Sequence, residues 1–117
     1  MWLESFSEQS FINFDKVISI KMITDQRNSE RITVTTEGPD KDEIEIIANE
    51  RARKFISSTT VFNDEQKKKI NGKDADAILS AFLAVLMRCL TSKELTKDRE
   101  IITREYISGL FFNALRD

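Results

Sequence analysis

The sequence predicts an α+β fold: a three- or four-stranded antiparallel meander in the N-terminal half, followed by three or four helices packed on one face. Three observations support this prediction. The first half alternates apolar and polar residues with the two-residue period of strands. The second half carries charge orders and stop signals typical of helices. A chain of 117 residues with three Gly and one Pro fits a single domain, residues 1–117, with few long loops.

Three short alternating segments predict the first strands. The first lies within residues 2–6, and the second covers residues 10–23. The alternation of the second segment shifts near Phe14, which indicates a bulge or bend. The third covers residues 31–37, which are rich in β-branched side chains, and it ends at the Gly-Pro pair at 38–39. The polar segments between these strands are predicted turns.

The segment after the Gly-Pro pair fits two interpretations. Residues 43–48 alternate as a strand does, yet the apolar residues from Ile44 to Ile56 also follow helical spacing. We prefer a fourth strand over residues 43–48 and then a helix capped by Asn49, because asparagine is a favoured N-cap. This strand also gives the third strand a neighbour. One long helix that starts near Pro39 is the alternative.

Three further segments predict helices. Residues 63–72 begin with an asparagine and acidic side chains, continue with lysines and stop at a glycine. A second helix is predicted over residues 74–91. A polar link follows, and a last helix covers residues 98–117, with a strand over residues 100–107 as the alternative.

The helix over residues 74–91 contains eleven consecutive uncharged residues, Ala77 to Met87. This run is too short to cross a bilayer, which needs about 20 apolar residues. Its bulky side chains fall within one arc of a helical wheel: Ile78, Leu79, Phe82, Leu83, Val85, Leu86, Cys89 and Leu90. The opposite side carries Ala77, Ser80, Ala81, Ala84 and Arg88. We predict a core helix whose bulky side faces the sheet and whose small side lets another helix approach closely.

The last predicted helix is apolar on more than one side, whereas a terminal helix on a monomer needs only one apolar stripe. The surplus must be covered by the alanine side of the preceding helix or by a second subunit. Because symmetric dimers are the commonest oligomers, we predict a homodimer formed through the C-terminal helices. Trp2 is a further candidate contact, since aromatic residues are enriched at interfaces. The predicted interface residues are Tyr106, Leu110, Phe111, Phe112, Leu115, Ala77, Ala81 and Ala84.

The residue types needed for several kinds of catalysis are missing. The chain has no histidine and a single cysteine, Cys89. This excludes Ser-His and Cys-His nucleophile pairs, and also zinc sites that one chain builds from histidine and cysteine. Asp74 and Asp76 fit the first turn of a helix, where negative charge is favoured. We predict a protein that is not an enzyme and has no cofactor or metal, and we interpret Cys89 as a buried, inert thiol.

Basic residues gather in two neighbouring segments, and they offer a second hypothesis. They are Arg51, Arg53, Lys54, Lys67, Lys68 and Lys69. A net charge of −2 does not fit a protein that binds nucleic acid over its whole surface. No aromatic side chains are interleaved with the lysines for base stacking. Nucleic-acid binding through this local patch is therefore the alternative to a protein-protein interaction.

The N-terminal segment lacks the features of a signal peptide, because Glu4 and Glu8 stand where an apolar region is required. A single cysteine fits a reducing compartment. We therefore expect a cytoplasmic protein without a membrane segment. The leading functional hypothesis is a small interaction or regulatory module that is homodimeric and meets a protein partner.

Overall fold

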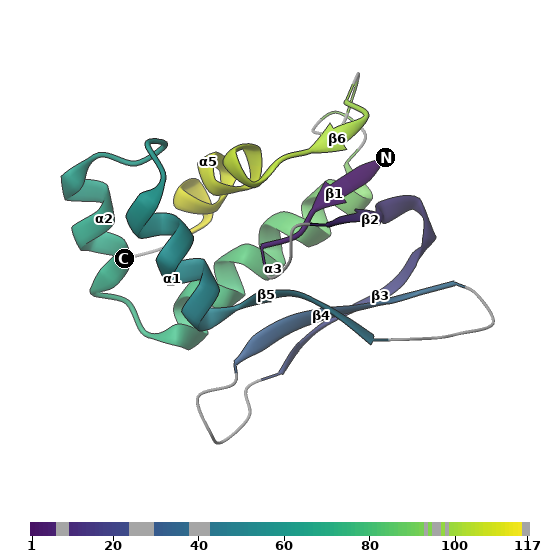
Figure 1. The fold of residues 1–117 in the computed structure, drawn as a ribbon, viewed down its shortest axis with the longest axis horizontal. Coiled ribbons are helices and arrows are strands. Elements are labelled where there is room, and N and C mark those ends of the chain that lie inside the picture. The colour runs from purple at the N-terminus through teal and green to yellow at the C-terminus, as the bar shows by residue number, and fades with distance from the viewer. Residues whose placement is uncertain are drawn as a thin grey trace.

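A computed structural model shows the fold (Figure 1) and describes residues 1–6, 10–23, 30–37, 43–92, 94, 97 and 99–115. The strands are β1 (Trp2–Glu4), β2 (Phe11–Asn13), β3 (Val17–Ile23), β4 (Arg31–Thr36), β5 (Glu43–Ala48) and β6 (Ile101–Ile102). The helices are α1 (Asn49–Ser58), α2 (Asp64–Asn71), α3 (Ala75–Thr91) and α5 (Arg104–Ala114), with a 3-10 turn η1 (Phe14–Lys16). The predicted turns near residues 8, 26 and 39, and part of the predicted link after α3, lie outside the described residues.

The larger sheet is the predicted antiparallel meander, with strand order β3-β4-β5. Met22 pairs with Ile32, and Ile32 pairs with Ile47, so these side chains share one face. Ile20 and Val34 pair on the same face. The opposite face carries the polar residues Ser19, Lys21, Thr33, Thr35, Glu43 and Glu45. The fold class is therefore α+β, and α3 packs on the apolar face, where it contacts β3 and β4.

The structure also contains a second, smaller sheet, which the sequence does not predict. It has the order β2-β1-β6, in which β1 pairs antiparallel with β2 and parallel with β6. Leu3 occupies the central strand and pairs with both Ile12 and Ile102, and all three side chains are buried. A strand of two residues is too short to give a periodic pattern, so the sequence does not reveal β6.

The prediction of one strand over residues 10–23 is wrong, because this segment forms two strands in different sheets. The side chain of Asn13 accepts a hydrogen bond from the Asp15 amide at 3.2 Å and starts η1. This turn separates β2 from β3 and buries Phe14. The irregularity predicted near Phe14 is confirmed, but it is a change of sheet and not a bulge within one strand.

The predicted strand over residues 43–48 is confirmed as β5, and the alternative of one long helix is wrong. The predicted cap of α1 is also wrong. Asn49 is the first helical residue, and the N-cap position is Ala48, which has no side-chain cap. The Asn49 Oδ1 atom instead accepts a hydrogen bond from Arg53 Nε at 3.2 Å. Asn49 therefore orients a side chain one turn further along α1.

Helices α2 and α3 lie where the sequence predicts them. Asn63 caps α2, and its side chain and that of Gln66 bond each other's backbone amides at 2.8 and 2.9 Å. This capping box satisfies two amides that the helix leaves open. Helix α2 ends at Gly72, as predicted. Asp74 caps α3 by accepting a hydrogen bond from the Ala77 amide at 2.8 Å.

The last predicted helix is correct only from Arg104 onward. Residues 101–102 form β6, so the alternative of a strand in this region is right for two residues. Thr103 Oγ1 accepts a hydrogen bond from the Tyr106 amide at 3.2 Å and starts α5. Helix α5 then runs beside α3 (Figure 1).

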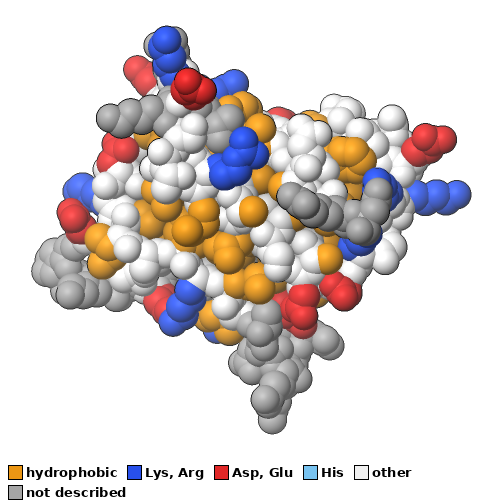
Figure 2. Space-filling model, turned by 180° about the vertical axis from the view of Figure 1, so that it is seen from behind, with side chains coloured by type: hydrophobic (Ala, Val, Ile, Leu, Met, Phe, Trp, Pro, Cys, Tyr) orange, Lys and Arg blue, Asp and Glu red, His pale blue; other side chains and the backbone are white. Residues whose placement is uncertain are grey.

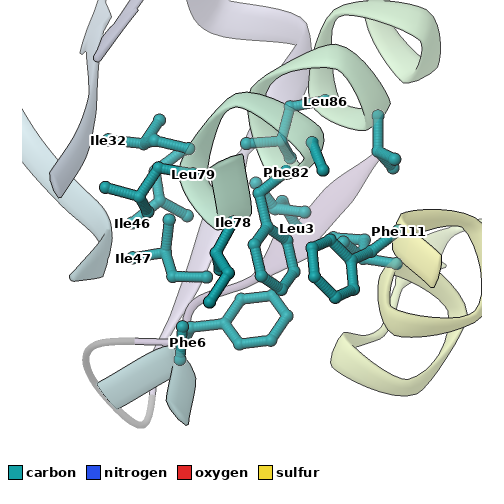
Figure 3. Packing of buried hydrophobic residues seen from close by; sticks show 14 of the residues in the cluster. Leu3, Phe6, Ile32, Ile46, Ile47, Ile78, Leu79, Phe82, Leu86 and Phe111 are labelled. Atoms are coloured by element: carbon teal, nitrogen blue, oxygen red, sulfur yellow. The ribbon is translucent and has the colours of Figure 1, made fainter. Parts of the chain in front are cut away.

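The core lies between the larger sheet, α3 and α5. Figure 3 shows side chains from β4, β5, α3 and α5 converging around Phe82. The Phe82 ring stacks on Phe111, with centroids 4.1 Å apart and planes 9° apart. Phe6 meets Phe55 and Phe82 edge to face, at 5.2 and 5.3 Å. Aromatic pairs of this kind add about 0.5–1.5 kcal/mol to the contribution of buried area.

The bulky side of α3 faces the core, as predicted, with one exception. Ile78, Leu79, Phe82, Val85, Leu86 and Cys89 are buried, and Leu83 is half-buried against the core. Leu90 is exposed, although the prediction places it on the buried side. Ala81 is buried, although the prediction places it on the opposite side. Leu90 lies in the last turn of α3, and Ala81 lies beside α5, whose end contributes to the same hollow.

Candidate interaction surfaces

The residues of α5 predicted to meet a second copy pack largely within the chain. Phe111 is fully buried against Phe82, and Leu115 is buried too. Tyr106, Leu110 and Phe112 are half-buried. Two of these rings lie under cations: Lys69 Nζ is 5.8 Å from the centroid of Phe112, and the Arg99 guanidinium is 3.6 Å from that of Tyr106. Much of the apolar surplus of α5 is therefore covered by its own chain.

The alanine side of α3 is covered only in part. Ala81 is buried, Ala77 is half-buried and Ala84 is exposed. Together with Ser80 and the end of α5, at Ala114 and Leu115, these alanines line a surface hollow of about 250 Å³. The end of α5 thus forms one wall of the hollow.

The outward side of α3 carries a row of residues spaced by three and four positions. We call it the outer row, and it consists of Ala77, Ser80, Ala84, Met87 and Thr91. Four members are exposed and Ala77 is half-buried; Met87 is the largest side chain, with 48% of its surface exposed. Figure 2 shows the face on which α3 looks outward, where hydrophobic side chains form a band across the middle.

Opposite charges flank the two ends of the outer row. Asp76 lies in the first turn of α3 and Arg88 in the last turns, and both are exposed. Within the described ranges, neither side chain forms an ion pair. Both signs are also those that the helix dipole favours at these ends.

The outward face of the smaller sheet forms a second apolar surface. Trp2 pairs with Ile101 across β1 and β6, and Phe11 lies on the neighbouring strand β2. The exposed fractions of these side chains are 46%, 44% and 53%, and they line a shallow hollow of about 350 Å³. Three large apolar residues at one place are more than the scattered exposed residues that soluble proteins normally show.

Several of the predicted nucleic-acid residues make contacts within the chain. Arg53 turns inward and donates to the Lys73 carbonyl at 2.8 Å. Lys67 donates to the Ser57 carbonyl at 3.1 Å. Lys69 lies over Phe112, as described above, and Lys68 is exposed on α2. The structure thus uses several of these cations for contacts within the chain.

Arg51 and Lys54 of α1 line a cleft of about 470 Å³. We call it the α1/α5 cleft. Its other lining residues are Phe6, Glu50, Phe55, Ser58 and Arg104. Arg104 comes from the first turn of α5 and faces the exposed side of α1 across the cleft.

Cys89 lies on the buried side of α3. Burial raises the pKa of its thiol above the ordinary value, and the positive charges of Arg88 and Arg99 oppose the shift only in part. A thiol with a raised pKa is protonated at neutral pH and reacts slowly. This supports the interpretation of Cys89 as a structural residue.

Sequence reasoning missed several residues of these surfaces. The helical wheel places the alanine and serine members of the outer row on the small side of α3. It misses Met87 and Thr91, although the spacing of three and four that joins them to the row is visible in the sequence. Phe11, Ile101 and Arg104 could not be found from the sequence, because only the small sheet and the start of α5 bring them to their neighbours. Long-range strand pairing leaves no local pattern in a chain.

Comparison of the chain with family models, curated proteins and solved structures finds no match. Across the described ranges, no helix has both the length and the apolar character needed to span a bilayer. No three Cys, Asp or Glu side chains gather as metal ligands within the same residues. The surfaces themselves are therefore the basis for assigning a function.

Proposed function

We propose that this protein is a small non-enzymatic interaction module that works as a symmetric homodimer, in which two copies pack antiparallel through the outer row of α3. The outer row is the observation that carries the proposal. Its alternating spacing of three and four residues is that of a seam between two paired helices. Small side chains at three of its five positions let two backbones approach closely.

The sizes of the side chains favour the antiparallel arrangement. A two-fold axis opposite Phe82 places Met87 of one copy against Ala77 of the other, and Ala84 against Ser80. The Met87 thioether then enters the hollow beside the alanines, where a long flexible side chain packs well. A parallel pair would place Met87 against Met87 and leave both hollows unfilled.

Asp76 and Arg88 flank the seam at equal distances from the axis. With the axis opposite Phe82, Asp76 of one copy lies at the height of Arg88 of the other. The two positions differ by about 120° around the helix, so they lie on opposite sides of the seam and form no direct ion pair. The sizes of the side chains, and not these charges, therefore determine the register.

Cysteine cross-linking tests both the dimer and its orientation. We expect sedimentation equilibrium to show a dimer for the unaltered chain. Ala77→Cys or Met87→Cys alone should form no disulfide-linked dimer, because the antiparallel register keeps each of these positions away from its own copy. The variant with both substitutions should cross-link, since position 77 meets position 87 of the other copy. A parallel dimer would instead cross-link each single variant.

A second pair of variants separates the interface from the fold. Ala84→Glu places a charge at the centre of the seam and should convert the dimer to a monomer without changing the circular dichroism spectrum. Ser57→Glu adds the same charge at an exposed position of α1 and should leave the dimer intact. A monomer mass that does not change with concentration for the unaltered chain would overturn the proposal.

A further inference from the structure

The α1/α5 cleft has the opposite charge to the rest of the protein. Arg51, Lys54 and Arg104 line it against a single carboxylate, that of Glu50. The whole chain carries a net charge of −2. A concave site whose charge opposes that of the protein concentrates ligands of the other sign, because its low-dielectric walls focus the field.

Of the three cations in the cleft, Arg51 contributes least to the stability of the fold. It is exposed, and among the described residues it makes no hydrogen bond or ion pair. Lys54 lies one turn further along the same side of α1, and its ion pair with Glu50 is 3.7 Å long between two well-exposed side chains. Such a pair is weak and opens at little cost.

Arg104 faces these two cations and is held in place. Its Nε lies 3.3 Å from Glu4 Oε1, and its guanidinium lies 5.4 Å from the centroid of the Phe55 ring. Glu4 also accepts a hydrogen bond from the Arg104 amide at 3.0 Å. An arginine fixed by a carboxylate and an aromatic ring loses little side-chain entropy when it binds a ligand.

From this arrangement we infer that the α1/α5 cleft is a binding site for a phosphate monoester. Two guanidinium groups and one ammonium group suit the oxygens of a phosphate dianion, because the arginine fork binds two oxygens at once. Lys54 pairs with Glu50 and Arg104 with Glu4, so the charge of Arg51 remains without a carboxylate partner among the described residues. The volume of about 470 Å³ suits a ligand of the size of a mononucleotide. The site shares no residue with the outer row of α3.

Titration with inorganic phosphate and with adenosine monophosphate, followed by two-dimensional NMR at low salt, tests the site. We expect both to shift the amides of α1 and the start of α5. Arg51→Ala should weaken binding by about tenfold, since it removes a charged hydrogen-bond donor. Lys68→Ala is the matched control: it removes one positive charge from an exposed position of α2 outside the cleft and should leave the affinity unchanged.

Three results would overturn the inference. One is the absence of shifts with either probe at low salt. Another is an equal loss of affinity in Arg51→Ala and Lys68→Ala, which would indicate a general effect of net charge. The third is binding to a ten-nucleotide single strand but not to the monophosphate, which would assign the cations to nucleic acid. Because Arg51 is exposed and makes no hydrogen bond or ion pair among the described residues, we expect its variant to melt at the unaltered temperature.

Discussion

Between Ala77 and Met87 the inner and outer sides of α3 are both free of charge, but they differ in their surroundings. The inner side carries Phe82, Val85 and Leu86, which are almost fully buried against the sheet and α5. The outer side carries Ala84 and Met87, which are exposed. The sides differ mainly in the volume of their side chains. The comparison teaches that size, more than hydrophobicity, separates the side that forms the core from the side left for another molecule.

The largest expected effect is the difference in the free energy of unfolding between a substitution on the inner side of α3 and one on its outer side. Phe82→Ala removes a ring that stacks on Phe111 and meets Phe6, so we expect a loss of about 3–5 kcal/mol. Met87→Ala should change the stability of the monomer by no more than about 0.5 kcal/mol, because this side chain is largely exposed. Urea unfolding at a protein concentration where the dimer dissociates measures both. Equal losses would show that the outer side belongs to the core.

Much of this difference was predictable from the sequence. The helical wheel separates Phe82 from Ala84, and the bulky arc is the buried side apart from Leu90. The meander of β3, β4 and β5 follows from alternation in the same way. These predictions succeed because each depends on a pattern within a few turns or one strand.

The remaining structure depends on contacts between distant parts of the chain. The small sheet joins Trp2 to Ile101, and η1 diverts the chain so that β2 enters this sheet. The α1/α5 cleft needs Arg104 beside α1, and the sequence places the two far apart. Asn49 shows a local failure: its side chain orients Arg53, although asparagine is a good cap. Tertiary contacts here override the local preference.

A smaller effect on stability is expected when a buried serine and an exposed serine are each replaced. Ser108 of α5 is fully buried, and its Oγ forms no hydrogen bond among the described residues. Ser80 lies on the outer side of α3 and is exposed, and its hydroxyl donates a weak hydrogen bond to Met22 Sδ at 3.9 Å. A buried hydroxyl without a partner destabilises a fold. Ser108→Ala should therefore stabilise the protein by about 1 kcal/mol more than Ser80→Ala, which thermal unfolding can resolve.

The converse result would identify a role for the Ser108 hydroxyl. If Ser108→Ala lowers the melting temperature while Ser80→Ala does not, the hydroxyl has a partner in solution, such as a buried water. Both substitutions add the same small gain in helix propensity, so the difference between them reports the burial of Ser108 and the loss of the contact between Ser80 and Met22. The measurement is made at a concentration where the dimer dissociates, because Ser80 belongs to the outer row.

The smallest expected effect is a change of stability with pH that comes from Cys89, on the inner side of α3. Burial raises the pKa of the folded thiol, whereas the unfolded thiol ionises near pH 8.5. Above that pH the unfolded chain loses a proton that the folded chain keeps. Stability should therefore be unaffected at neutral pH and fall as the pH rises from about 8.5 toward the folded pKa. Cys89→Ala should lack this part of the decline, and the difference between the two urea titrations isolates it.

Thiol accessibility gives an independent measurement of the same residue. A thiol reagent such as Ellman's reagent should react slowly with the folded protein at pH 8 and rapidly in denaturant, because both burial and protonation protect Cys89. Rapid reaction with the folded chain would mean that α3 exposes its inner side. The same assay on Ala84→Glu should remain slow, because a charge on the outer row separates the two copies without opening the core.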